Sequence, residues 1–174
     1  KATLHADNVA PYELIRPYMT WNWNGPSLET MSKSEKDALN ASWASLLDFC
    51  SDEDMLAVVD TSGSMHSSYG LPAAVALSLG LYLAEHNKGR FRNHFIEFSE
   101  RPQLIRLKGE TFVDKLRYIL TFDEIADTNL EAVFQLILCV AVKNKLPQKE
   151  LPGKLVIISD MEFNVCVTNA SETN

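Results

Sequence analysis

The sequence predicts an α/β fold with a doubly wound, mostly parallel sheet, on three observations. Short apolar runs alternate along the chain with longer segments of helical periodicity. Two of these runs end abruptly at polar residues, one at Asp60 and one at Ser159. The chain has 174 residues, 46% hydrophobic and 22% charged, which are the length and composition of one globular domain.

The first fifty residues predict helices rather than strands. A helical turn is expected over Tyr12–Tyr18, directly after Pro11. A longer helix is expected to begin at Ser32, because Ser32-Lys33-Ser34-Glu35 forms a capping box, and to end near Cys50. Residues 1–51 are therefore expected to be a short helical N-terminal extension that packs on, or leads into, a domain over residues 52–174.

The rest of the chain predicts alternating strands and helices. The expected strands are Met55–Val59, His94–Phe98, Gln103–Leu107 and Leu155–Ile158. The expected helices are Leu71–Asn87, Thr111–Leu120 and Leu130–Val142. The apolar part of the uncharged stretch ending at Ala84 is shorter than the ~20 residues that a bilayer requires, so it predicts a buried core helix and no membrane span.

Charge and cysteine content restrict the function classes. The net charge of -7 disfavours a protein that binds mainly through nucleic-acid phosphates, although a local basic strip stays possible. Such a strip could be formed by Lys88, Arg90, Arg92, Arg101, Arg106 and Lys108. Cys50, Cys139 and Cys166 form no C-x-x-C pair, so we interpret them as small core residues and expect a cytoplasmic protein.

Polar side chains gather where the predicted parallel strands end. The candidate metal ligands are Asp60, Ser62 and Ser64 after the first strand, Thr128 before a later helix, and Asp160 after the last strand. Because ligands bind outside the carboxyl ends of the strands in such sheets, we expect these oxygens to converge. A set of hard oxygen donors suits Mg²⁺, with Ca²⁺ or Mn²⁺ as alternatives.

The segment Asp60-Thr61-Ser62-Gly63-Ser64 resembles the D-x-S-x-S signature of von Willebrand factor A (vWA) domains, which begins their metal-ion-dependent adhesion site (MIDAS). Thr128 and Asp160 match, in order and context, the Thr and Asp that complete that site. The run Ser159-Asp160-Met161-Glu162-Phe163 is similar to the A domains of the Ro (TROVE-type) autoantigen group and to the DUF2828 family. The family's usual pair of glycines before the Thr is replaced by Ala126-Asp127.

The resemblance implies a vWA-type sheet in which Gln103–Leu107 runs antiparallel at an edge. The family sheet has six strands, so the last strands are expected to be missing from this chain. It also implies a divalent cation with one open coordination position, which accepts a Glu or Asp side chain from a partner protein. The expected function is therefore non-catalytic, metal-dependent protein binding.

Two other functions are weighed against this one. The resemblance to the Ro group leaves an RNA-associated role as the alternative, with RNA bound by the full-length protein. A phosphotransferase of the haloacid dehalogenase type is less favoured, because it requires a second Asp where Ser62 stands and a Lys beyond Lys154. The sequence offers no nucleophile elbow and no general base, so an enzyme is not expected.

Overall fold

The computed structural model describes residues 9–19, 25–50, 54–99, 101–122 and 129–161, and it has a mixed α/β fold. The strands are β1 (Met55–Asp60), β2 (His94–Phe98), β3 (Gln103–Arg106) and β4 (Lys154–Ile158). The α-helices are α1 (Pro11–Ile15), α2 (Lys33–Ala44), α3 (Ser67–His86), α4 (Phe112–Ile119) and α5 (Leu130–Lys143). Short 3₁₀ turns cover Arg16–Tyr18, Gly63–His66, Leu120–Phe122 and Gln148–Glu150.

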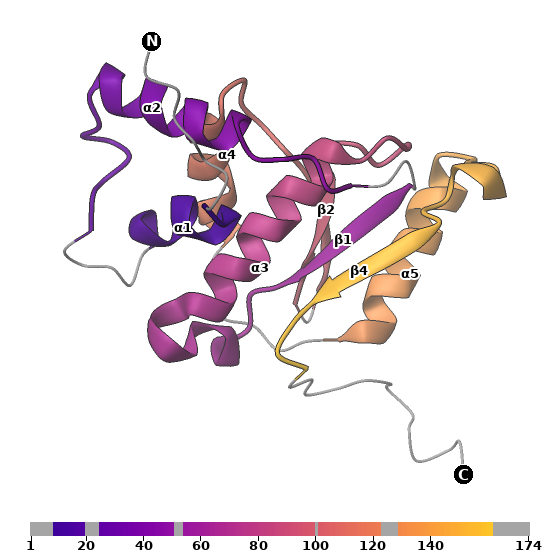
Figure 1. The fold of residues 1–174 in the computed structure, drawn as a ribbon. Coiled ribbons are helices and arrows are strands. Elements are labelled where there is room, and N and C mark those ends of the chain that lie inside the picture. The colour runs from indigo at the N-terminus through magenta and orange to yellow at the C-terminus, as the bar shows by residue number, and fades with distance from the viewer. Residues whose placement is uncertain (1–8, 20–24, 51–53, 100, 123–128, 162–174) are drawn as a thin grey trace.

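The four described strands form one open sheet in the order β3-β2-β1-β4 (Figure 1). β1 is central and runs parallel to both of its neighbours, with Val59 opposite Glu97 on β2 and Ile158 on β4. β3 pairs antiparallel with β2, which confirms the expected antiparallel edge strand. All four predicted strands are present within one residue of their expected limits.

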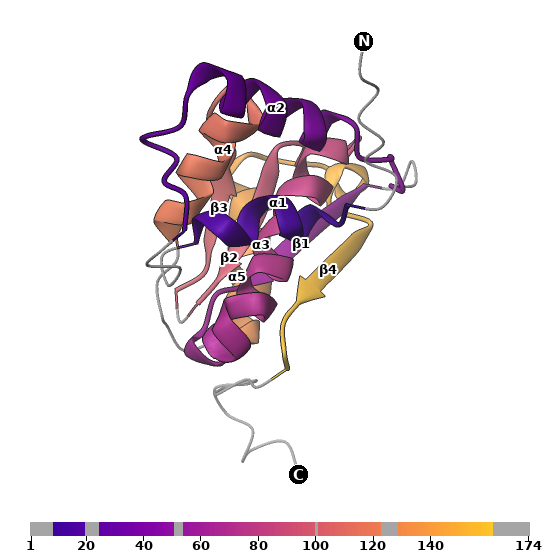
Figure 2. The same cartoon turned by 60° about the vertical axis from the view of Figure 1, so that its left-hand side comes forward.

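Helices cover both faces of the sheet. The face with Ala57 and Val59 packs on α3, around which α1, α2 and α4 are gathered (Figures 1 and 2). The opposite face, with Leu56 and Val58, packs on α5 through Val133. Since strands buried on both faces are apolar throughout, this arrangement explains why β1 is an uninterrupted apolar run up to its last residue.

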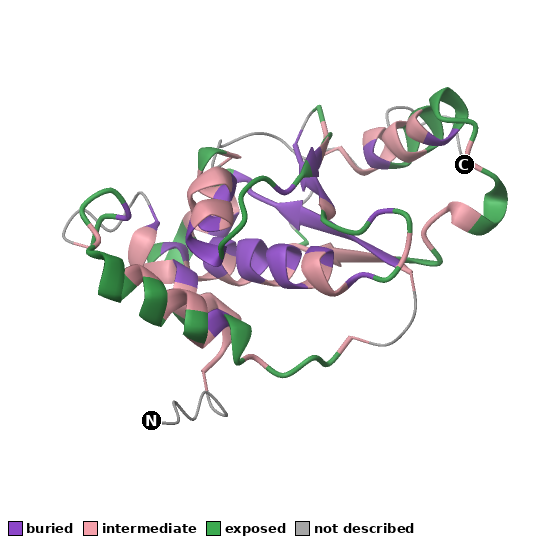
Figure 3. Cartoon of the chain, turned by 90° about the horizontal axis from the view of Figure 1, so that it is seen from above, coloured by how far each residue is buried: buried purple, intermediate pink, exposed green. Residues whose placement is uncertain are grey.

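α3 is the central helix of the larger layer, and buried residues recur along its length (Figure 3). Its first residues are not regular helix, because Ser68, Tyr69 and Gly70 have left-handed backbone angles. The regular part therefore begins where the sequence predicts, at Leu71. Among the described residues, Gly63–His86 is the one helical stretch long and apolar enough to cross a bilayer by length and composition. Of the apolar 18-residue window within it, 56% is buried inside the fold, as in a core helix.

The N-terminal helices begin as expected, but α2 ends earlier than Cys50. The Ser32 hydroxyl accepts a hydrogen bond from the backbone of Glu35, and the Glu35 carboxylate accepts one from the backbone of Ser32, so the capping box is confirmed. After Ala44 the chain leaves the helix and crosses α3. There the Tyr82 hydroxyl donates to the carbonyl of Leu47 and accepts from the backbone N–H of Phe49.

The expected burial of the cysteines is wrong for Cys139. This residue is exposed on the outer side of α5, and Cys50 is only half-buried. The outer side of α5 also exposes Phe134, Leu138 and Val142. A helix that is apolar around its whole circumference does not reveal from sequence which side meets the sheet. Cys166 lies outside the described residues.

Candidate metal centre

The candidate site lies where β1 and β4 end side by side. Asp60 is the last residue of β1, and its side chain is fully buried. Ser159 follows β4 directly, and its hydroxyl donates to Asp60 Oδ2 over 2.5 Å. The backbone N–H of Met161 donates in turn to the Ser159 hydroxyl, over 2.9 Å. Parallel pairing thus brings two segments 99 residues apart together at one carboxylate.

The loop after β1 turns back onto the same carboxylate. The backbone N–H of Ser62 donates to Asp60 Oδ1 over 2.9 Å, and the N–H of Met65 donates to the Ser62 carbonyl over 3.1 Å. This turn places the hydroxyl oxygens of Ser62 and Ser64 3.1 Å apart. Ser62 is buried and Ser64 is half-buried, so their hydroxyls line the inner part of the edge.

The donor set fits a small divalent cation. Neighbouring ligands of an octahedral Mg²⁺, at about 2.05 Å from the metal, lie about 2.9 Å apart. The 3.1 Å between the hydroxyls of Ser62 and Ser64 is close to that separation. Seven-coordinate Ca²⁺, with ligands at about 2.4 Å, has neighbouring equatorial ligands about 2.8 Å apart, so the spacing suits either ion.

The structure does not place the other two candidate ligands, Asp160 and Thr128, within this hydrogen-bonded group. Asp160 follows Ser159 at the same edge of the sheet, but its side chain is exposed. Thr128 lies outside the described residues. The structure therefore brings Asp60, Ser62 and Ser64 into one hydrogen-bonded group and leaves Asp160 beside it.

Hydroxyls would have to supply much of the coordination at this edge. The described part of the chain holds no group of three or more His, Cys, Asp and Glu side chains suited to a metal. A site built from serine hydroxyls and one buried carboxylate differs from such clusters in carrying little negative charge. Its metal affinity is expected to be correspondingly modest.

Sequence reasoning missed a second buried carboxylate, that of Glu97 on β2. The hydroxyl of Thr61 donates to Glu97 Oε1 over 3.3 Å, and that of Ser99 donates to Oε2 over 3.0 Å. Glu97 thereby positions the first residue after Asp60. The signal was present in the sequence, because a charged residue inside an apolar strand is buried only when it is paired.

The fold and this edge define an α/β protein whose central parallel strand ends in a buried carboxylate surrounded by serine hydroxyls. The chain belongs to DUF7788, a family of domains of unknown function, whose family model matches residues 54–174. It is also similar to "Uncharacterized protein L728" of Acanthamoeba polyphaga mimivirus, with 30% identity over 173 residues. That similarity covers 99% of this chain but only 28% of the viral protein. No solved structure matches the chain.

Neither match names an activity. The resemblance to vWA domains and to DUF2828, and the division of the chain at residue 52, therefore stay predictions. The structure adds that the N-terminal helices share a core with the rest of the chain, since Ile15 and Trp43 pack in the same cluster as Val59.

Proposed function

We propose that this chain is a vWA-type domain that binds Mg²⁺ at a MIDAS-like site and uses the metal to engage an acidic side chain of a protein partner, without catalysing a reaction. The proposed ligands, direct or through water, are Asp60, Ser62, Ser64, Thr128 and Asp160. The observation that carries the proposal is the pair of hydroxyls at 3.1 Å on a loop tied to a fully buried carboxylate.

The arrangement of the sheet supports the finer assignment of fold. β1 is central, helices lie on both faces, and the site occupies the carboxyl ends of two adjacent parallel strands. This is the edge at which doubly wound sheets bind ligands. The antiparallel edge strand β3 agrees with the vWA resemblance.

The charge of the donor set supports the proposed partner chemistry. Hydroxyl ligands are neutral, so only the carboxylates of Asp60 and Asp160 would offset the two positive charges of the metal. An ion with few anionic ligands stays electrophilic and attracts a further carboxylate. We infer that a Glu or Asp from another protein supplies it.

Calorimetric titration with Mg²⁺ tests the metal site. Ser64→Ala and Asp60→Ala should each weaken Mg²⁺ binding by about tenfold or more, because each removes an oxygen of the proposed set. Ser67→Ala is the matched control, since Ser67 is exposed three residues further along and belongs to no ligand set. Undiminished Mg²⁺ affinity in both ligand variants would contradict the proposal.

Capture of partners tests the function. Wild-type protein and Asp60→Ala are compared with Mg²⁺ and with EDTA, and both protein and RNA are scored. Protein captured by the wild type only in Mg²⁺, and not by Asp60→Ala, supports metal-dependent binding. RNA retained equally in EDTA and released by rising salt would instead support the RNA-associated role.

A further inference from the structure

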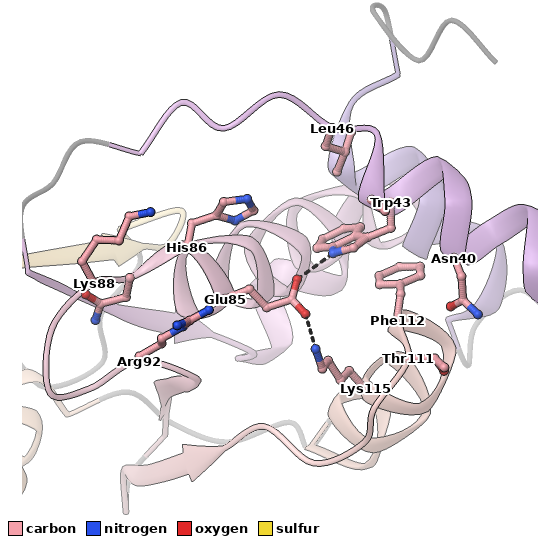
Figure 4. A pocket seen from close by; sticks show the side chains of 12 residues that line it. Asn40, Trp43, Leu46, Glu85, His86, Lys88, Arg92, Thr111, Phe112 and Lys115 are labelled. Carbon is pink, nitrogen blue, oxygen red and sulfur yellow. Dashed lines mark hydrogen bonds and ion pairs between the residues drawn. The ribbon is translucent and has the colours of Figure 1, made fainter. Parts of the chain in front are cut away.

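A cavity of about 540 Å³ lies at the end of the sheet opposite the candidate metal site (Figure 4). It is enclosed by α2, the last turn of α3, the connection to β2 and the first turn of α4. Asn87, which lines it, holds the beginning of β1 by donating to the carbonyl of Met55, whereas Asp60 ends that strand. Its volume is typical of sites for small molecules.

The lining of this cavity is cationic in a chain whose net charge is -7. Lys88, Arg92 and Lys115 contribute three positive charges, and Glu85 contributes one negative charge, so the formal sum is +2. The Glu85 carboxylate already accepts two hydrogen bonds, from Lys115 Nζ over 2.5 Å and from Trp43 Nε1 over 2.7 Å. An anion entering the cavity would therefore meet a carboxylate whose charge is offset by its neighbours.

Two of these cations, Arg92 and Lys88, are exposed and available for a ligand. Among the described residues, the guanidinium of Arg92 makes no hydrogen bond or ion pair, and its side chain is exposed at the cavity. Lys88 lies 3.8 Å from Asp48, and both side chains are about half exposed. Exposed ion pairs of this kind contribute little, so Lys88 can turn to a more strongly charged anion.

The opposite wall is aromatic. The rings of Trp43 and Phe112 stack with centroids 4.2 Å apart and planes 11° from parallel. Both side chains are almost fully buried in the fold, and Leu46 lines the same cavity. Because the two rings stack on each other and are almost fully buried, it is their edges, together with Leu46, that form an apolar wall beside the cations.

We propose that this cavity binds a small molecule in which a phosphate monoester is joined to a planar ring. A phosphate monoester carries about −1.5 to −2 charges at neutral pH, which matches the formal +2 of the lining. The fork of the Arg92 guanidinium suits two phosphate oxygens, and Lys88 adds a second donor. The ligand ring contacts the edges of Trp43 and Phe112 and the side chain of Leu46. This inference does not depend on the proposed metal site.

Binding of phenyl phosphate, measured by calorimetry in EDTA, tests the proposal with the metal site inactive. Phenol and inorganic phosphate each carry one half of the proposed chemistry and should bind at least tenfold more weakly than phenyl phosphate. AMP and O-phosphotyrosine distinguish a nucleotide from a modified amino acid as the source of the group. If none of the three ring phosphates binds saturably, the proposal is wrong.

Variants locate the binding. Arg92→Ala and Lys88→Ala should each weaken phenyl phosphate binding by about tenfold or more, since charge-assisted hydrogen bonds are lost. Both side chains are exposed, so folding is expected to persist, and thermal unfolding checks it. Arg101→Ala is the control, because Arg101 is an exposed arginine at the other end of the sheet. Equal affinity in all three variants would overturn the assignment.

Discussion

Gly80→Ala should destabilise this protein, although alanine is normally the better helix residue. Gly80 is buried on α3 where the helix crosses β1, and a methyl group there would overlap Cγ2 of Val59. Val59 is fully buried in the central strand and cannot turn away. Overpacking costs about 1–3 kcal/mol, and the gain in helix propensity offsets up to about 1 kcal/mol. The expected net loss is about 1–2 kcal/mol.

Thermal unfolding followed by circular dichroism measures this loss. For a chain of this size, the melting temperature should fall by about 2 to 8 °C. The decisive comparison is Gly80→Ala in a Val59→Ala background, where the overlapping methyl is absent. There the substitution should be neutral or stabilising, so the two changes should couple strongly. A stabilised Gly80→Ala protein, or an equal cost in both backgrounds, would refute the reasoning.

Three further predictions concern buried polar groups and acid stability. Asn87→Ala should lower the free energy of unfolding, measured in urea, by about 2 kcal/mol, because it removes the side chain that hydrogen-bonds to the backbone of Met55. A decrease below about 0.5 kcal/mol would contradict this. Hydrogen bonds from the hydroxyl and backbone of Ser32 lower the pKa of Glu35. The contribution of the Glu35 carboxylate to folding stability is therefore complete above the usual glutamate pKa, about 4.3, and is lost as pH falls through the lower pKa of the folded state. Glu35→Gln should therefore make the free energy of unfolding fall less steeply with decreasing pH in the acid range. An unchanged fall would count against this role of Glu35. Glu97→Ala should weaken Mg²⁺ binding more than Glu97→Gln in the same titration, because Gln keeps an acceptor for the neighbouring hydroxyls; equal effects would argue against this positioning role.

The features that the sequence predicts best are those specified by neighbouring residues. The capping box at Ser32 predicts the start of α2, because both of its hydrogen bonds join residues three positions apart. The apolar run from Met55 predicts β1 and its abrupt end at Asp60. Because Ser159 follows a second predicted parallel strand, the sequence also predicts that it lies at the same edge of the sheet as Asp60, and the hydrogen bond between the two side chains confirms this.

What the sequence could not predict depends on contacts between distant segments. α2 ends at Ala44 because the following chain binds Tyr82, a residue more than thirty positions away. The left-handed stretch over Ser68, Tyr69 and Gly70 is signalled by residue type at Gly70 alone, since only glycine favours such angles. The role of Glu97 became visible only when β2 was placed beside β1, which brings the hydroxyl of Thr61 to its carboxylate.

The pairing of β4 with β1 has a consequence for the order in which parts of the chain fold. β2 joins β1 across 38 positions, as in Ala57 and Phe95, whereas Met55 and Lys154 are 99 positions apart. Closing the longer loop costs about 0.8 kcal/mol more in chain entropy, so we expect β4 to dock after β1, α3 and β2 have associated. Until then the apolar edge of β1 stays open to pairing with other chains. Because Ser159 arrives with β4, the surroundings of Asp60 are completed last, and a nascent chain can form its helical layer before it forms the proposed metal site.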